Sequence, residues 1–170
     1  MRRFVSALLA LSAGAALLVG SVAHALGLPE DTVVLTLRGA VSQPNKGAEA
    51  VFDMKMLAAL PQKTFTTQTP WYPQPVSFTG PLLRDVLASA GARGGKVVAA
   101  ALNDYRTDIP FDDALRHDVI VARLMNDKPM PVREKGPLFI VYPYDSKTEL
   151  RSEIFYNRSA WQLKTLTVMP

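Results

Sequence analysis

Residues 97–145 read VVAAALNDYRTDIPFDDALRHDVIVARLMNDKPMPVREKGPLFIVYPYD, and they decide the fold because they hold most of the strand-like runs of the chain. Three apolar runs have the length of buried strands, and turn-forming polar residues separate them. The runs are Val97–Leu102, Val119–Met125 and Leu138–Tyr142. This stretch is therefore expected to fold as strand, polar turn, short acidic helix, strand, tight turn, basic loop and strand.

Shorter elements are expected on both sides of this stretch. Alternating and β-branched residues predict strands, whereas Asp53 and Pro81 are typical of helix starts and Gly91 of a helix end. The expected strands are 33–38, 48–52, 63–69, 76–79 and 159–168, the helices are 54–60 and 81–90, and the irregular segments are 70–75 and 145–158. The mixture indicates an α+β fold, mostly β, with mixed sheets and short helices.

The first 25 residues have the composition of a secretory signal peptide. Two arginines precede an apolar run at 4–19, and Ala23-His24-Ala25 is a small-residue cleavage site. We therefore expect a periplasmic or secreted protein with one domain at 26–170 and no membrane span after cleavage. An uncleaved membrane anchor is the alternative, but the apolar run is short for a span.

Composition excludes several kinds of site. The chain has no cysteine, which excludes disulfides and thiolate metal sites. His117 is the one histidine beyond the expected signal peptide, so a multi-histidine metal site is excluded too. Without Arg2 and Arg3, 17 basic and 15 acidic residues remain, and no basic stripe indicates nucleic-acid binding.

Three segments resemble the molybdopterin-binding domain of the sulfite oxidase family. The segment LNDY…IP…VIVARLMNDKPMPVREKGPLFIVYP is similar to that family's strand, polar elbow, Asn-Gly-Lys-Pro turn and Gly-Pro before a further strand. The stretch FTGPLLRDVL at 78–87 is similar to the start of a family helix, and WQLKTL at 161–166 to a family strand. Together they extend over about residues 33–168, in the family's order.

The resemblance implies an oxidoreductase domain in which a cysteine thiolate after a strand holds molybdenum. By chain order this position falls near Thr69, where the sequence has no cysteine. A hydroxyl oxygen does not replace a soft thiolate on molybdenum. The departure favours a protein without catalytic residues, metal ligands or a bound cofactor, and binding of molybdopterin without the thiolate is the alternative.

Two hypotheses follow. The first is a non-catalytic exported binding module that holds a small polar or anionic ligand, or a membrane sensor protein, in the cleft equivalent to the cofactor site. The second is a molybdopterin-dependent oxidoreductase that ligates its metal without cysteine.

Polar and aromatic residues at strand ends are the candidate ligand-binding residues, because a packed sheet presents such positions at its edge. Lys135 beside Gly136 suits an anion, and the alternative for this pair is a solvated turn. The aromatic residues at 71–72 either form the rim of a pocket or cap the core. The residues expected to contribute to one cleft are Thr69, Trp71, Asn103, Asp104, Tyr105, Lys135, Gly136 and Tyr142.

Other chemistries are disfavoured by spacing. The aspartates between 104 and 118 match no calcium-loop pattern, and Asp112 and Asp113 suit the first turn of a helix. His117 has no G-x-S-x-G nucleophile to serve and is expected as a cation at a helix end.

The exported form is expected to begin at Leu26, because the small-residue site precedes it directly. Intact mass of the protein recovered outside the cytoplasm checks this expectation. A membrane-bound species that keeps Met1 contradicts it.

Overall fold

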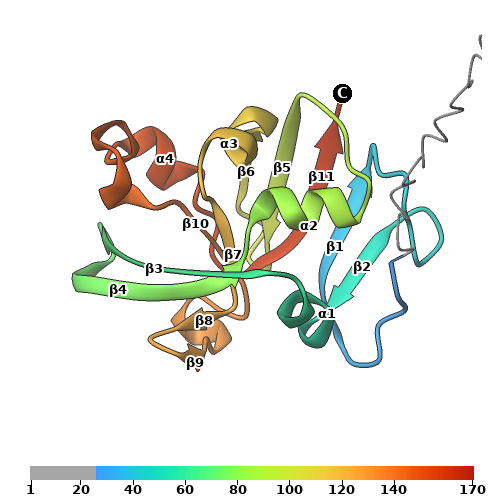
Figure 1. Cartoon of the computed structure of the whole chain (residues 1–170), viewed down its shortest axis with the longest axis horizontal. Coiled ribbons are helices and arrows are strands. Elements are labelled where there is room, and N and C mark those ends of the chain that lie inside the picture. Colours follow the sequence, from blue (N-terminus) through green and yellow to red (C-terminus); the bar gives the residue numbers. More distant parts are fainter. Residues whose placement is uncertain (1–25) are drawn as a thin grey trace, which may run out of the picture.

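The strands form three sheets, which Figure 1 shows in a computed structural model. The structure describes residues 26–170, so the expected signal peptide and its cleavage site lie outside the described residues. The five-stranded sheet has the order β2-β1-β11-β5-β6. Its strands are β1 (Val33–Gly39), β2 (Ala50–Asp53), β5 (Lys96–Ala101), β6 (Arg106–Pro110) and β11 (Leu163–Met169).

The C-terminal strand lies at the centre of this sheet. β11 pairs in parallel with β1, where Leu37 lies opposite Leu166, and antiparallel with β5. The outer strands β2 and β6 pair antiparallel with β1 and β5. The sheet is therefore mixed, and the expected α+β class with mixed sheets and short helices is confirmed.

The second sheet is built on a long hairpin that extends to the left in Figure 1. Its order is β3-β4-β8-β9, with strands β3 (Gln62–Thr69), β4 (Tyr72–Pro81), β8 (Leu124–Met125) and β9 (Lys128–Pro129). The expectation of an irregular segment at 70–75 was wrong, because β4 already begins at Tyr72. Pro73 and Pro75 are tolerated because they fall at a register shift and β4 meets β8 only at Phe78 and Thr79.

The third sheet is a pair of short strands, β7 (Ile120–Ala122) and β10 (Phe139–Val141), and every residue of both is buried. The run 119–125, expected as one strand, is divided between β7 and β8. The division has a clear cause, since β7 pairs with β10 whereas β8 pairs with β4. One apolar run thus contributes a strand to each of two sheets.

Local sequence explains the helix ends. The Asp53 carboxylate caps α1 (Met54–Ala59) by accepting the Met56 N–H at 2.8 Å. At the end of α2 (Leu83–Ser89), Gly91 has φ +60°, and the Ala92 N–H reaches the Leu87 carbonyl at 2.9 Å. Pro81 belongs to β4, so its expected place in the helix was wrong.

The chain after β10 is more ordered than the sequence indicated. The segment 145–158 was expected as a surface loop, but it contains two 3₁₀ turns, at Tyr144–Ser146 and Thr148–Leu150, and the helix α4 (Glu153–Asn157). A further 3₁₀ turn spans Val132–Glu134. The acidic helix α3 (Phe111–Arg116) is present as expected.

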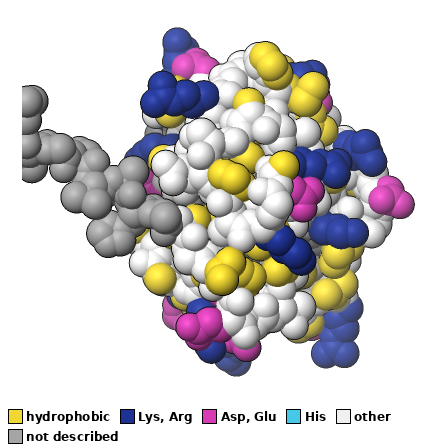
Figure 2. All heavy atoms as spheres, turned by 90° about the vertical axis from the view of Figure 1, so that its right-hand side faces the viewer, with side chains coloured by type: hydrophobic (Ala, Val, Ile, Leu, Met, Phe, Trp, Pro, Cys, Tyr) yellow, Lys and Arg dark blue, Asp and Glu magenta, His cyan; other side chains and the backbone are white. Residues whose placement is uncertain are grey.

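One hydrophobic core joins the three sheets. Val86, Leu87, Ile120 and Ile140 are buried within it, and Leu82 and Trp161 pack against it while partly exposed. Among residues 26–170, no helix has the length and apolar character needed to cross a membrane. Figure 2 shows the right-hand face of Figure 1, where hydrophobic side chains are scattered among basic, acidic and neutral groups.

Truncation of a core residue should destabilise the fold. Leu87→Ala and Ile140→Ala each remove a fully or almost fully buried side chain, and each is expected to cost about 2–5 kcal/mol of unfolding free energy. Urea unfolding monitored by circular dichroism measures the loss. Leu115→Ala, at a position 59% exposed, is the matched control and should change the unfolding free energy little.

Candidate functional site

Aromatic side chains from four parts of the chain line a cleft of about 310 Å³, which we call the aromatic cleft. They come from the β3–β4 turn, the turn before β6, α4, and the segment before β11. A volume near 300 Å³ lies at the small end of the range for small-molecule sites. The lining residues are Pro70, Trp71, Tyr105, Glu153, Tyr156, Asn157 and Trp161.

Trp71 is the central ring of this group. It lies in the two-residue turn between β3 and β4, and its indole meets Trp161 at 5.7 Å and Tyr156 at 6.1 Å between ring centroids. Both pairs have the edge-to-face geometry that aromatic quadrupoles favour. Trp71 also packs on Phe139 of β10 at 5.4 Å, which fixes the turn against the core.

Tyr105 closes another side of the cleft. Its ring is nearly parallel to that of Trp161, with 3° between the planes and 6.3 Å between the centroids. Its hydroxyl donates to the Asn157 carbonyl at 2.7 Å, a contact between residues 52 positions apart. Tyr105 is nevertheless 42% exposed, so the residue remains accessible to a ligand.

Lys135 brings a positive charge to the same group of rings. The residue has a left-handed backbone, with φ +73°, and its ammonium lies 3.9 Å from the Trp161 centroid and 5.7 Å from that of Trp71. Such cation–π contacts stabilise a cation over an aromatic face. Partial burial lowers the pKa of Lys135 below its usual value.

The structure brings Trp71, Tyr105 and Lys135 together, and it places the other sequence-predicted residues around them or elsewhere. The Thr69 hydroxyl accepts the backbone N–H of Trp71 at 3.3 Å. Asn103 is exposed and accepts the Tyr105 N–H at 3.2 Å. These two side chains shape the turns that carry the rings.

Only Trp71 and Tyr105 of the eight predicted residues line the aromatic cleft, and the remaining three are, like Thr69, Asn103 and Lys135, not among its lining residues. Asp104 is an exposed turn residue with φ +65°. Gly136 lies against the Met130 carbonyl, where a Cβ atom would overlap the oxygen, so its lack of a side chain is a packing requirement. Tyr142 is fully buried, and its hydroxyl points to Asp113 instead of the cleft.

Sequence reasoning missed Glu153, Tyr156, Asn157 and Trp161. The first three belong to α4, in the segment expected as a surface loop, and Trp161 fell within the expected strand 159–168, whereas β11 begins only at Leu163. A usable signal was present in the adjacent aromatic residues Phe155 and Tyr156, since two rings are unusual in a fully solvated loop.

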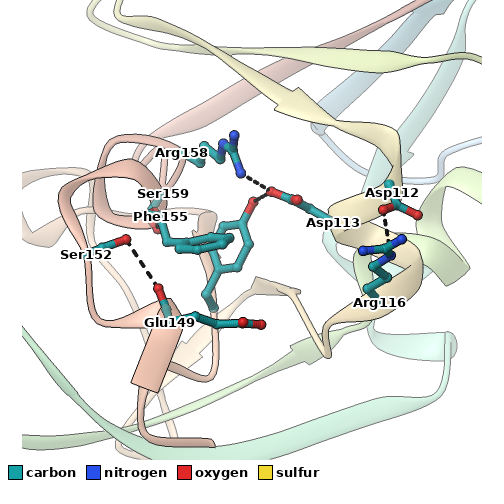
Figure 3. A network of polar contacts seen from close by, with 9 residues as sticks. Asp112, Asp113, Arg116, Glu149, Ser152, Phe155, Arg158 and Ser159 are labelled. Carbon is teal, nitrogen blue, oxygen red and sulfur yellow. Dashed lines mark hydrogen bonds and ion pairs between the residues drawn. The ribbon is translucent and has the colours of Figure 1, made fainter. Parts of the chain in front are cut away.

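A buried carboxylate attaches the α4 segment to the core, as Figure 3 shows. Asp113 of α3 accepts one hydrogen bond from the Tyr142 hydroxyl and one from Arg158, each at 2.8 Å. Burial, and then the charge of Asp113, raise the pKa of Tyr142 far above its usual value, so the hydroxyl keeps its proton and donates. The aromatic cleft therefore depends on a polar contact outside it.

Adjacent aspartates provide a matched test of this contact. Asp113→Ala leaves the Tyr142 hydroxyl buried without an acceptor and should cost about 1–3 kcal/mol of unfolding free energy. Asp112→Ala removes only an exposed i,i+4 pair with Arg116 and should cost about 0.5 kcal/mol or less. Urea unfolding of the two variants measures the difference, and equal losses would contradict the structural role of Asp113.

Comparison with known proteins supplies the family. A family model described as the oxidoreductase molybdopterin binding domain matches residues 26–146, which is more than half of the chain. No curated protein matches the sequence. With the match extending from the start of the described chain through β10, this chain belongs to the oxidoreductase molybdopterin binding domain family.

Proposed function

We propose that this chain is an exported, non-catalytic member of its family, which binds a small flat polar molecule in the aromatic cleft. One observation carries the proposal. Trp71, whose ring packs against Phe139 and Trp161, donates its backbone N–H to Thr69. Thr69 is the position near which the resemblance to sulfite oxidases implies a metal-binding thiolate. The aromatic cleft thus lies close in sequence to Thr69, where the resemblance implies a thiolate ligand that this chain lacks.

The donor set does not fit a molybdenum centre. The chain has no cysteine, and among residues 26–170 no three His, Asp or Glu side chains gather as a metal-binding group. Thr69 is 8% exposed, and its oxygen already accepts the Trp71 N–H. A hard, hydrogen-bonded hydroxyl offers molybdenum no equivalent of a thiolate, so no step of catalysis is assigned to these residues.

The cleft chemistry supports a flat ligand. Trp161 and Tyr105 line the cleft as a stacked pair, and aromatic surfaces hold planar groups by stacking without selecting one particular heterocycle. Glu153 and Asn157 add polar groups at the rim, and Lys135 adds a cation below Trp161. The carboxylate of Glu153 makes the cleft less suited to a purely anionic ligand than the sequence suggested. A heterocycle with polar edges, such as a metal-free pterin, has the matching chemistry.

Metal content separates the two hypotheses on function. Protein purified from cells that synthesise the molybdenum cofactor should contain far less than one molybdenum atom per chain, as measured by elemental analysis. Stoichiometric molybdenum would overturn the proposal and favour the oxidoreductase that ligates its metal without cysteine.

Binding tests the cleft directly. Titration calorimetry with a pterin should detect binding, and Tyr105→Ala should weaken it by about 5- to 100-fold through loss of a stacking face. Tyr105→Phe is the matched control, because it keeps the ring and loses only the hydroxyl bond to Asn157. The cleft is not the site if both variants bind as the parent protein does.

A further inference from the structure

A second cleft, of about 380 Å³, lies between β3, the end of α3 and the 3₁₀ turn at Tyr144–Ser146, and we call it the basic cleft. It shares no lining residue with the aromatic cleft. Its volume is within the range of small-molecule sites. The lining residues are Lys63, Phe65, Arg116, His117, Asp118, Pro143, Ser146 and Lys147.

The acidic residue of this cleft is already neutralised. Asp118 accepts from Arg84 at 2.9 Å and faces Lys63 at 3.4 Å. The hydrogen bond from Arg84 holds the pKa of Asp118 below its usual value, so the carboxylate stays ionised and bound to its partners. Asp118 therefore does not act as an unpaired negative charge that would repel an anion.

The basic residues exceed the acidic ones around this cleft. Arg116 pairs with Asp112 at 2.7 Å, whereas no carboxylate of the described residues lies within 4 Å of the Lys147 ammonium. The charged residues of the lining and their ion-pair partners comprise four cations (Lys63, Arg84, Arg116 and Lys147) and two carboxylates (Asp112 and Asp118). Two positive charges remain uncompensated, with His117 counted as neutral. Such an excess in a hollow concentrates anions.

The walls combine this charge with apolar surface. His117 is only 9% exposed, and its ring is held edge-on against Phe155 at 5.7 Å between centroids. Its Nδ1 atom lies 3.5 Å from the Lys147 ammonium, so a fixed imidazole and an unpaired cation meet at the same place. Phe65 and Pro143 supply apolar surface beside them.

From this arrangement we propose that the basic cleft binds a small organic anion. Its carboxylate or phosphate group contacts Lys147, Lys63 and His117, and its apolar body lies against Phe65 and Pro143. A charge-assisted hydrogen bond supplies the recognition, and the apolar wall distinguishes an organic anion from an inorganic one. This site is independent of the aromatic cleft and of the function proposed for it.

Phenyl phosphate is the probe, since it joins an anionic group to a ring. In titration calorimetry at low salt it should bind more tightly than inorganic phosphate, which lacks the ring, and than phenol, which lacks the charge. Raising the salt concentration should weaken it. Benzylammonium is the control for the sign of the charge, because it joins a ring to a positive group instead of a negative one. Equal binding of benzylammonium and phenyl phosphate, or no binding of phenyl phosphate at millimolar concentration, overturns the proposal.

Lys147 is the informative position for substitution, because within residues 26–170 it forms no ion pair and its replacement leaves no carboxylate without a partner. Lys147→Gln should weaken phenyl phosphate binding by about 10- to 100-fold, with the unfolding free energy unchanged. Lys164→Gln removes an exposed lysine of β11 away from the cleft and should leave binding intact. Equal affinities of Lys147→Gln and the parent protein reject the site.

The NMR signals of the histidine and the two tryptophans can show in which cleft phenyl phosphate binds. His117 is the only histidine of residues 26–170, and both tryptophans of the chain line the aromatic cleft. Phenyl phosphate should shift the imidazole signal that disappears in His117→Gln, and leave the two indole N–H signals in place. Shifts confined to the indoles would assign the anion to the aromatic cleft and reject the basic cleft.

Discussion

The buried pair β7–β10 is the joint on which the arrangement of the other elements depends. On one side, the Leu83 N–H donates to the Val119 carbonyl at 2.8 Å and the Arg123 N–H to Thr79 at 2.9 Å, which attaches the hairpin sheet and α2. On the other side, the Leu163 N–H donates to the Leu138 carbonyl at 2.9 Å, which attaches β11. Backbone groups buried at such a joint must be paired, so the relative position of the two larger sheets is fixed.

This joint explains how the aromatic cleft is formed from distant parts of the chain. Trp71 stands at the turn of the hairpin sheet, and Trp161 lies just before the central strand of the five-stranded sheet. Phe139 of β10 packs against both rings, at 5.4 Å and 6.3 Å between centroids. A ring of the joint therefore sets the spacing of the two indoles. A site built on such fixed elements loses little conformational entropy when a ligand binds.

The wall formed by α4 has a different origin. No residue of α4 is fully buried, and a helix of this length is not stable by its own hydrogen bonds. Its position instead follows from the bond between Arg158 and Asp113 and from ring contacts such as Tyr156 with Tyr144. One wall of the cleft is thus held by side chains, whereas the Trp71 wall is held by a strand pair.

Sequence patterns predicted the elements whose signals are local. The Asp53 cap, the Gly91 helix end and the apolar runs of β1, β5 and β10 depend on neighbouring residues, and the structure contains all of them. The division of 119–125 between two sheets depends on which partners are available, and no local pattern records that choice.

The candidate site was also predicted only in part, because local sequence patterns do not record tertiary partners. Trp71, Tyr105 and Lys135 stood out at strand ends, and the fold brings them together. Tyr142 also stood at a strand end, but alternation along a short buried strand does not reveal that its hydroxyl meets Asp113 in the core. The α4 residues were missed because a polar composition hid a segment ordered by tertiary contacts.

The lack of cysteine in the chain and the aromatic packing near the end of β3 both support the proposed function. A metal ligand at the end of β3 needs both a soft donor and open space in front of it. Near Thr69, where the resemblance implies the thiolate, the chain has no such donor. Two residues further on, the Trp71 indole makes ring contacts to Phe139, Tyr144, Tyr156 and Trp161. Because buried aromatic contacts of this kind contribute strongly to packing, the strand end now stabilises the fold. The aromatic cleft is lined mainly by aromatic side chains, and this is why we propose ligand binding as its function.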